Sequence, residues 1–414
     1  MKRTKVYIVT EARRGAYYGI GTYIEQLIVC LRTLQIDMVL LRLFVPQLSE
    51  MKKKTREDGI EQIDIPFIPV CEKTQAERYF RNIAFLLKDT LSPGERPLFH
   101  LNFMLDAALI TTLRTTLNAK IILTFHFSEW SFLLSGNYER LCTILQKNDD
   151  QRTEFESRIC KSIAQTKATL DQCDRIICIA WHSRETLRRL YQVQESKLTV
   201  IANAVQDIDR LPSSPAKQRI RERYHIKPET RIILFAGRLD EVKGISPLIE
   251  ACKKVFDIYP QTHLFLAGEG DFSCWQEQVS GYWMNISFTG KLSRQQLYDF
   301  YRIAEIGVCP SLYEEFGLVA IEMMMHRCPL IVTDTSGLAE SVEDRISGLK
   351  VPIRQTSESR SIDYDLLADK ICFLLDNPAY ARQLAAQGRM RYERFYSMPV
   401  FQDRMRKVYN QILC

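Results

Sequence analysis

Cys-x-x-Cys pairs are absent from this 414-residue sequence, although it contains twelve cysteines. The absence argues against a redox dithiol and against a cysteine-based zinc site. Several of the cysteines, including Cys178, Cys252 and Cys372, fall within apolar runs, where a thiol acts as a small hydrophobe. The six histidines show no metal-ligand spacing either, so we expect no metal site. A reducing compartment is the simplest interpretation.

Long apolar runs are missing as well. No run approaches the roughly 20 residues of a membrane-spanning helix, and the opening MKRTKVYIVT lacks the longer apolar core of a signal peptide. The formal net charge is only +6, with most of the excess in residues 1–210, and an excess of this size is typical of a solvated face and not of a nucleic-acid-binding surface. We therefore expect a cytoplasmic protein without a nucleic-acid partner, at most peripheral at the inner membrane face.

A dinucleotide-binding fingerprint is also incomplete. Gly19 and Gly21 stand between a strand-like run, residues 5–10, and an amphipathic helical pattern, but the third glycine would fall at position 24, which is Ile24. The two glycines form either a tight turn or a loop that faces a cleft. Their place between the first strand and the first helix favours the cleft loop.

Strand-like and helix-like segments alternate through the whole chain, which predicts an α/β fold with parallel sheets. The length suits about two domains. The segment DIDRLPSSPAKQ is rich in Pro, Ser and charge and is typical of a linker. We therefore expect two Rossmann-like doubly wound domains, residues 1–208 and 229–395, joined by a linker at 209–228, with a C-terminal helix at 396–414 that returns to the first domain.

The most informative stretch begins at Pro310-Ser311. Glu314 precedes Phe316 and Gly317, after which Leu318 opens an apolar helical pattern that carries Glu322. A helix start preceded by glycine lets a bulky group approach unpaired backbone amides, and such an end attracts phosphate. Both carboxylates could accept hydrogen bonds from sugar hydroxyls. For either glutamate alone, complementing the helix dipole would be a sufficient explanation.

Two further signals point to a ligand cleft. Arg238 and Lys243 flank the loop GRLDEVKG after a predicted strand, where they are either solvated loop charges or a pair able to neutralise a diphosphate. His126 ends the β-branched run KIILTFH. A residue that follows a parallel strand points into the crevice where doubly wound folds bind ligands.

Taken together, these strings resemble the donor site of family 4 glycosyltransferases, which have the GT-B fold and retain anomeric configuration. The resemblance implies that Glu322 binds the donor ribose and that Glu314 contacts hydroxyls of the donor sugar. It implies catalytic roles for Glu314, Arg238, Lys243 and His126, with the Arg and Lys on the donor phosphates. It further implies that the donor is bound by Glu322, Phe316, Gly317, Leu318, Gly268, Gly270, Thr289 and Gly290. Gly19 and Gly21 would form a loop that faces the cleft.

The resemblance implies a retaining transfer of a hexose-type sugar from a nucleotide-diphosphate sugar to an acceptor hydroxyl, without a metal ion. The stretch GIGTYIEQL is similar to a Bacteroidetes branch associated with peptide-maturation genes, so the acceptor is a peptide, a glycan or a lipid-linked glycan of polysaccharide biosynthesis. The basic aromatic segment at about 75–91 either packs on a sheet or contacts a membrane or an acceptor. A sugar-nucleotide epimerase or hydrolase, a phosphorylase of the same fold and a non-catalytic sugar-nucleotide-binding protein remain as alternatives.

Overall fold

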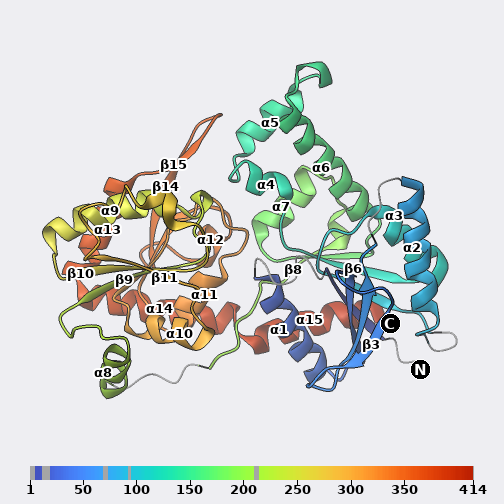
Figure 1. Cartoon of the computed structure of the whole chain (residues 1–414), viewed down its shortest axis with the longest axis horizontal. Coiled ribbons are helices and arrows are strands. Elements are labelled where there is room, and N and C mark those ends of the chain that lie inside the picture. The colour runs from blue at the N-terminus through green and yellow to red at the C-terminus, as the bar shows by residue number, and fades with distance from the viewer. Residues whose placement is uncertain (1–4, 12–18, 69–72, 92–94, 209–213, 414) are drawn as a thin grey trace. The chain divides into compact units, whose positions relative to one another are not determined.

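The computed structural model describes residues 5–11, 19–68, 73–91, 95–208 and 214–413. The chain divides into two compact units (Figure 1). An N-terminal unit comprises Met1–Glu129, Asn148–Ala204 and Met398–Cys414, and a C-terminal unit comprises Trp130–Lys147 and Val205–Ser397. The expected pair of Rossmann-like domains is confirmed, since each unit contains one sheet that is parallel apart from a strand at its edge.

The N-terminal unit is built on an eight-stranded sheet with the order β3-β4-β2-β1-β5-β6-β7-β8. Only β3 runs antiparallel to its neighbour, β4. The strands are β1 (Val6–Glu11), β2 (Met38–Val45), β3 (Lys52–Thr55), β4 (Glu61–Pro66), β5 (Leu98–Leu101), β6 (Lys120–Phe125), β7 (Arg175–Cys178) and β8 (Leu198–Val200).

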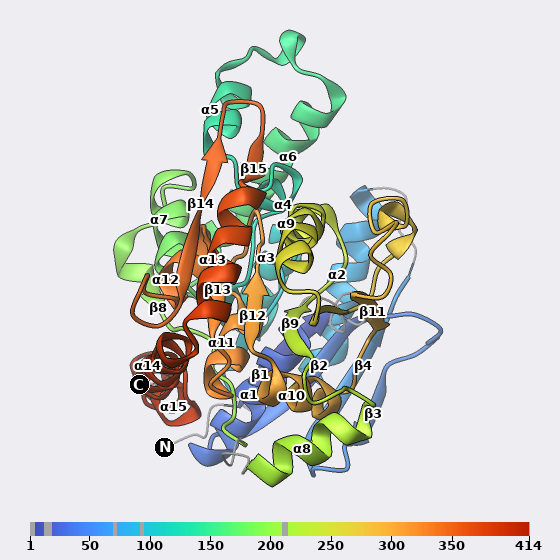
Figure 2. The same cartoon turned by 90° about the vertical axis from the view of Figure 1, so that its left-hand side faces the viewer.

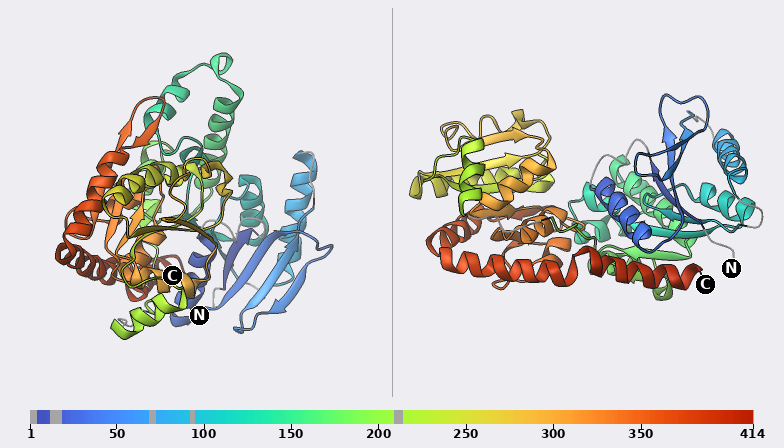
Figure 3. Two further views of the ribbon diagram at one scale, coloured as in Figure 1. Left: turned by 60° about the vertical axis from the view of Figure 1, so that its left-hand side comes forward. Right: turned by 90° about the horizontal axis from the view of Figure 1, so that it is seen from below.

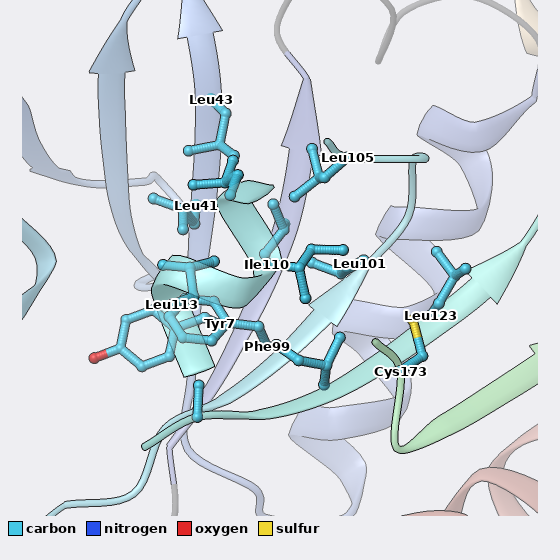
Figure 4. Packing of buried hydrophobic residues seen from close by; sticks show 14 of the residues in the cluster. Tyr7, Leu41, Leu43, Phe99, Leu101, Leu105, Ile110, Leu113, Leu123 and Cys173 are labelled. Carbon is cyan, nitrogen blue, oxygen red and sulfur yellow. The ribbon is translucent and has the colours of Figure 1, made fainter. Parts of the chain in front are cut away.

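Helices cover both faces of this sheet, which is why its strands are apolar on both sides. The helices are α1 (Ile20–Thr33), α2 (Lys73–Lys88), α3 (Ala107–Leu117), α6 (Glu154–Asp171), α7 (Trp181–Arg189) and α15 (Met398–Leu413), with the short 3-10 helices η1 (Asp149–Gln151) and η2 (Glu195–Lys197). In β1, Tyr7 and Val9 join a core with α2 and α3, whereas Val6 and Ile8 join a core with α1 and α15. Figure 4 shows side chains of the first of these cores gathered between strands and helix α3.

The last helix, α15, belongs to the N-terminal unit and packs beside α1, as Figure 3 shows. Phe401 of α15 lies edge-on to Tyr23 of α1 with ring centroids 6.0 Å apart. Tyr409 is fully buried in the same core. The chain end is therefore part of the N-terminal core.

The C-terminal unit has a seven-stranded sheet with the order β11-β10-β9-β12-β13-β14-β15, in which only β15 is antiparallel. Its strands are β9 (Arg231–Ala236), β10 (Thr262–Ala267), β11 (Ile286–Gly290), β12 (Ile306–Cys309), β13 (Leu330–Asp334), β14 (Leu349–Gln355) and β15 (Arg360–Ile362). Its helices are α8 (Ser214–Arg223), α9 (Ile245–Ile258), α10 (Arg294–Ile303), α11 (Leu318–Met325), α12 (Ser336–Ser341), α13 (Tyr364–Asp376) and α14 (Pro378–Phe395), with the 3-10 helices η3 (Glu241–Lys243) and η4 (Phe272–Trp275).

The segment predicted as a linker contains helix α8, which belongs to the C-terminal unit. Arg221 bonds to Glu305 at 2.8 Å, and Arg223 bonds to Asp299 of α10 at 2.9 Å. A segment with the composition of a linker can form this helix because its charged side chains hold most of α8 against the unit. The first part of the expected linker, residues 209–213, lies outside the described residues.

Residues 130–147 were expected to belong to the first domain, but they form part of the C-terminal unit. They contain most of α4 (Glu129–Leu133) and all of α5 (Tyr138–Gln146). The amide of Asn137 donates to the carbonyl of Thr356 at 2.8 Å, at the tip of the β14–β15 hairpin, and Figure 2 shows that hairpin extending toward α5. Sequence reasoning missed this packing because the partners are more than 200 residues apart.

Helices of sufficient length and apolar character to cross a bilayer do not occur in the part of the chain that the structure describes. The basic aromatic segment forms α2, whose Tyr79 and Phe80 are buried in the core of the N-terminal unit.

Candidate active site

The C-terminal sheet reverses its strand order between β9 and β12, which lie side by side at its centre. Ligands of open α/β sheets bind at the carboxyl ends of the strands, at such a reversal. The loop after β9 holds Arg238 and Lys243, and the loop after β12 holds Glu314. The structure therefore brings three of the predicted catalytic residues together at the carboxyl ends of the strands of one sheet.

Lys243 and Glu314 form an ion pair in this crevice. Their side chains are only 15% and 24% exposed. The hydroxyl of Ser311 also donates to Glu314, at 3.3 Å. A carboxylate held between an ammonium group and a hydroxyl is fixed in direction.

The loop that carries Lys243 is held by Asp240, the N-cap residue directly before η3. Its carboxylate accepts the backbone N–H of Lys243 at 3.1 Å and lies 3.1 Å from the guanidinium of Arg238. Arg238 is more exposed than Lys243. The two cations thus flank a short capped turn, with one end buried against Glu314 and the other open to solvent.

Helix α11 begins directly after Gly317, as predicted. Gly317 has φ 87°, a left-handed conformation that favours glycine, and a Cβ there would lie 2.7 Å from Leu338 Cδ2. Phe316 is buried and packs edge-on against Tyr396. Leu318 is the first residue of the helix. The backbone at Phe316–Leu318 is therefore presented at a helix start without a side-chain cap, where amides can meet an anion.

Glu322 lies within α11 and accepts a hydrogen bond from the hydroxyl of Tyr301 at 3.0 Å. Burial raises the pKa of Glu322 to about 7, because it disfavours the charged carboxylate, and the Tyr301 hydroxyl partly opposes that shift. Sequence reasoning did not identify Tyr301, which is buried on α10. Its position in an apolar helical pattern is indistinguishable from that of an ordinary core tyrosine.

The glycines of the neighbouring loops are explained by close backbone approach. A Cβ at Gly244 would lie 1.9 Å from the carbonyl oxygen of Pro310, and one at Gly268 would lie 1.6 Å from that of Gly237. At Gly270 it would lie 2.4 Å from the carbonyl oxygen of Leu239. The loops after β9, β10 and β12 are thereby packed directly against one another, which places Gly268 and Gly270 beside the loop of Arg238.

Thr289 and Gly290 end β11, the edge strand next to β10. The hydroxyl of Thr289 donates to the carbonyl of Gly290 at 2.9 Å. Gly290 has φ 67° and open space around its Cβ position, so it is required for its backbone conformation alone. Both residues lie at the carboxyl ends of the strands, as does Gly268, whose N–H donates to the Gly290 carbonyl at 3.0 Å.

Arg360 of β15 is a site residue that sequence reasoning did not find. One of its guanidinium nitrogens donates to the carbonyls of Leu312 and Ser135, both at 2.7 Å, and the other donates to the hydroxyl of Thr335 at 3.0 Å. Burial lowers the pKa of Arg360. This side chain joins the loop before Glu314 to the 130–147 segment. No local pattern could reveal it, because Leu312 is 48 positions away in the sequence.

His126 lies in the N-terminal unit, directly after β6, and is buried. It packs edge-on against Tyr23 with centroids 4.7 Å apart, and its Nε2 has no hydrogen-bond partner among the residues that the structure describes. Burial lowers the pKa of His126 to about 3, so the ring is neutral near pH 7. A buried ring nitrogen without a partner is costly unless a ligand or water satisfies it.

A buried polar chain continues from this region. Tyr23 and Thr124 share a hydrogen bond of 2.8 Å, and Thr124 is 2.7 Å from Nε2 of His100. His100 Nδ1 is 2.5 Å from the hydroxyl of Tyr409. Burial, reinforced by His126, lowers the pKa of His100 to about 3. The chain ties helices α1 and α15 to the strand that presents His126.

A cavity of about 530 Å³ lies at the carboxyl ends of β1, β5 and β6, within the N-terminal unit. Its lining includes His126, Glu11, Asn102 and Glu129. The side-chain oxygen of Asn102 is buried, and no described residue hydrogen-bonds to it. Like the C-terminal crevice, this cavity lies where the strand order reverses, here between β1 and β5.

Gly19 and Gly21 lie at the start of α1. Gly19 precedes the helix with φ 75°, and Gly21 is its second residue. Residues 12–18 of the same loop lie outside the described residues. No group of three or more potential metal ligands occurs among the side chains that the structure describes.

Family models match both halves of the chain. The model "Glycosyltransferase Family 4" matches residues 17–208, and the model "Glycosyl transferases group 1" matches residues 216–391. The chain therefore belongs to the family 4 glycosyltransferases of the GT-B fold, which confirms the predicted resemblance to that family.

Individual relatives are distant. An uncharacterized glycosyltransferase of Methanocaldococcus jannaschii is 30% identical over 189 residues, which cover 44% of this chain and 48% of that protein. The alpha-D-kanosaminyltransferase of Streptomyces kanamyceticus is 26% identical over 241 residues, 57% of this chain and 60% of that protein. The matches thus span about half of the length of these curated relatives.

Solved structures resemble the chain along nearly its whole length. Sucrose-phosphate synthase from Thermosynechococcus elongatus has a TM-score of 0.76 at 22% identity and covers 99% of both chains. Anabaena HepE in complex with UDP and glucose has a TM-score of 0.71 at 13% identity and covers 98% of this chain and 99% of that one. At these identities the likeness shows the fold, which is the GT-B fold.

Proposed function

We propose that this glycosyltransferase moves a hexose-type sugar from a nucleotide-diphosphate sugar to an acceptor hydroxyl with retention of anomeric configuration. The observation that carries the proposal is the ion pair of Lys243 and Glu314 at the strand-order reversal, with Arg238 in the same loop. The site thus combines an oriented carboxylate for sugar hydroxyls with cations for a diphosphate.

Catalysis in such a site is largely positioning and electrostatics. Negative charge grows on the diphosphate as the sugar–phosphate bond breaks. Arg238, Lys243 and the amides at the start of α11 would stabilise that charge, and we propose that they do so without a metal ion. We name no carboxylate nucleophile; the proposed route is same-face attack, in which the leaving phosphate accepts the proton of the acceptor hydroxyl.

The donor is proposed to be a nucleotide sugar held mainly by the C-terminal unit, with Glu322 on the ribose and the loops of Gly268, Gly270, Thr289 and Gly290 near the nucleotide. Solved relatives with UDP and UDP-glucose bound support this class of donor. The acceptor is proposed to bind the N-terminal cavity that His126 lines, whose polar side chains suit a hydroxyl-bearing group.

Peripheral membrane contact belongs to the proposal through α2. Phe85 is 64% exposed, and Arg78, Arg81 and Lys88 are exposed on the same helix. An exposed aromatic ring among cations suits an anionic bilayer surface. A lipid-linked or surface-polysaccharide acceptor would be encountered there, whereas a peptide acceptor would not require it.

The proposal is tested with a thermal-shift panel of UDP-, GDP- and ADP-sugars, with magnesium and with chelator. A ligand that binds the folded state raises its melting temperature by mass action. We expect one nucleotide to raise it, equally with magnesium and with chelator. Product anomers, read by NMR once an acceptor is identified, would then show retention.

Turnover assays with the same donors separate the alternatives. Donor consumption without any acceptor would indicate an epimerase or a hydrolase. A requirement for free phosphate in place of a nucleotide would indicate a phosphorylase. Donor binding with no turnover on any acceptor would indicate a sugar-nucleotide-binding protein, although binding alone would not require Arg238, Lys243, Glu314 and Glu322 together.

A further inference from the structure

A second cavity, of about 240 Å³, lies in the C-terminal unit at the amino ends of the strands, whereas the proposed donor loops lie at their carboxyl ends. Arg231, the first residue of β9, and Ile306, the first residue of β12, line it. Because β9 has six residues, its amino end is roughly 20 Å from the loop of Arg238 at its carboxyl end. The cavity is therefore separate from the donor site.

Six cationic side chains line this basic cavity. They are Lys217, Arg221, Arg231, Arg302, Arg327 and Arg382. Glu305 is the one carboxylate in the same lining, and Arg221, at 2.8 Å, and the backbone N–H of Ile232 already bond to it. Positive charge therefore exceeds negative charge within the lining, which is the condition for binding an anion.

Two of the cations are uncommitted. Lys217 on α8 and Arg382 on α14 are exposed, and neither has an ion pair or a side-chain hydrogen bond with any described residue. Arg231, by contrast, bonds to the carbonyl of Leu375 and lies over the ring of Tyr259. The cavity thus combines cations fixed by backbone contacts with two that are available to a ligand.

The backbone supplies an independent observation. Arg327 has φ 55°, a left-handed conformation that a long side chain rarely adopts, at a position after α11 where glycine is usual. The residue at this strained position is one of the cations of the cavity lining.

We propose that the basic cavity is a second anion site, which binds a phosphate or diphosphate group away from the donor loops. Planar guanidinium groups recognise phosphate oxygens, and the volume suits one such group and not a whole nucleotide sugar. The group is carried either by a soluble phosphorylated compound or by the headgroup of an anionic lipid.

The test compares two variants of the full chain with equal changes in charge. The cavity variant is Lys217→Glu with Arg382→Glu, and the matched control is Arg219→Glu with Arg394→Glu, exposed positions on the same helices α8 and α14 that are outside the lining. Melting temperatures are measured with pyrophosphate against chloride at equal ionic strength, with and without saturating UDP. Flotation with phosphatidic acid vesicles, against phosphatidylcholine vesicles, follows for each protein.

With saturating UDP, which occupies the proposed donor site, pyrophosphate is expected to raise the melting temperature of the wild type and of the control. This rise is expected to be lost in the cavity variant. Equal flotation of all three proteins would assign the site to a soluble phosphate compound, whereas flotation lost only in the cavity variant would assign it to a lipid headgroup. Equal pyrophosphate shifts in the cavity and control variants, or no shift in the wild type, would overturn the proposal.

The response to UDP alone reports on the donor site, so a failure of the proposed function is recognised separately. If the double charge reversal unfolds the protein, Lys217→Gln with Arg382→Gln is compared with Arg219→Gln and Arg394→Gln. That comparison uses the same readouts and the same criteria.

Discussion

The ammonium group of Lys243 is paired with the carboxylate of Glu314, a residue 71 positions further along the chain. The pair joins the loop after β9 to the loop after β12, and the N–H of Leu312 reinforces the junction by donating to the carbonyl of Val242 at 2.7 Å. A cation held in this way faces the crevice without the freedom of a surface lysine. The pair is therefore the first place to test the site.

Lys243→Met is expected to lower kcat/KM by about 100-fold or more, because it removes a preorganised cation from the leaving group. Arg238→Ala and Glu314→Gln should lower transfer strongly as well. The matched control is Lys253→Met, which breaks the 2.8 Å pair with Glu250 in the same unit and should leave transfer unchanged. The measurement is nucleotide release in the presence of acceptor, and near-normal rates in all three site variants would contradict the assignment.

Glu322 predicts a pH dependence. Its pKa of about 7 in the folded protein lies above the ordinary carboxyl value, so the folded state binds the proton more tightly than the unfolded state does. Its contribution to stability is therefore greatest below about pH 4.5 and declines as the pH rises to about 7, by roughly 1–3 kcal/mol. Urea unfolding at pH 5 and pH 8 should show that Glu322→Gln lacks this part of the decline.

Donor affinity should also depend on the ionisation of Glu322, but it should rise with pH, whereas the stability of the fold declines. A carboxylate accepts ribose hydroxyls better than a neutral carboxyl group does, so donor affinity should rise between pH 6 and pH 8. Calorimetric titration of the wild type against Glu322→Gln measures it. An equal rise in both proteins would show that another group is responsible.

Arg360→Met should weaken both the fold and the donor site. It leaves the carbonyl of Ser135 without its donor and that of Leu312 with only the Thr335 hydroxyl, at 3.2 Å, which costs about 1–3 kcal/mol. It also frees the loop that carries Glu314, which should raise the KM for the donor. Arg354→Met, on the same hairpin, is the control. Arg354 is 72% exposed and pairs with Asp363, so its loss should cost at most about 1 kcal/mol. Unfolding curves and donor KM that are alike in the two variants would refute the role of Arg360.

Gly268→Ala and Gly290→Ala test two different reasons for which glycine is required. At Gly268 the reason is steric contact, and at Gly290 it is the backbone conformation. At Gly290 the φ of 67° costs about 1–2 kcal/mol for alanine, with no collision. At Gly268 the added carbon would lie 1.6 Å from the carbonyl oxygen of Gly237, so the loop of Arg238 must move, at about 3 kcal/mol or more. Thermal unfolding measures the difference, and a milder effect at Gly268 than at Gly290 would be the contrary result.

Local patterns in the sequence predicted much of the fold. Residues 120–126 were expected as a strand and form β6 with His126 directly after it, and the helix expected from Leu318 begins at Leu318. These succeed because hydrophobic periodicity and glycine positions are local properties. The candidate residues Arg238, Lys243 and Glu314 were predicted to share one site for the same reason, since each lies next to a strand end or a helix start, and the structure places all three at the carboxyl ends of neighbouring strands.

Contacts between distant segments could not be predicted in this way. Tyr301 and Arg360 have ordinary sequence surroundings, and their roles follow only from what tertiary packing places against them. The assignment of residues 130–147 to the C-terminal unit is of the same kind, as is helix α8 within the expected linker. A pattern of polar and apolar residues predicts that a segment packs, not which segment it packs against.

The division of the chain has a consequence for chimaeric enzymes. The backbone passes from one unit to the other at 129/130, 147/148, 204/205 and 397/398, so a donor half taken from residue 205 onward would leave its own piece, residues 130–147, behind. Tyr313 would then lose the backbone of Gly136, against which its ring is packed, and Arg360 would lose the carbonyl of Ser135. We therefore expect a chimaera that exchanges the C-terminal unit to fold better when residues 130–147 are transferred together with that unit than when a single junction at 204/205 is used.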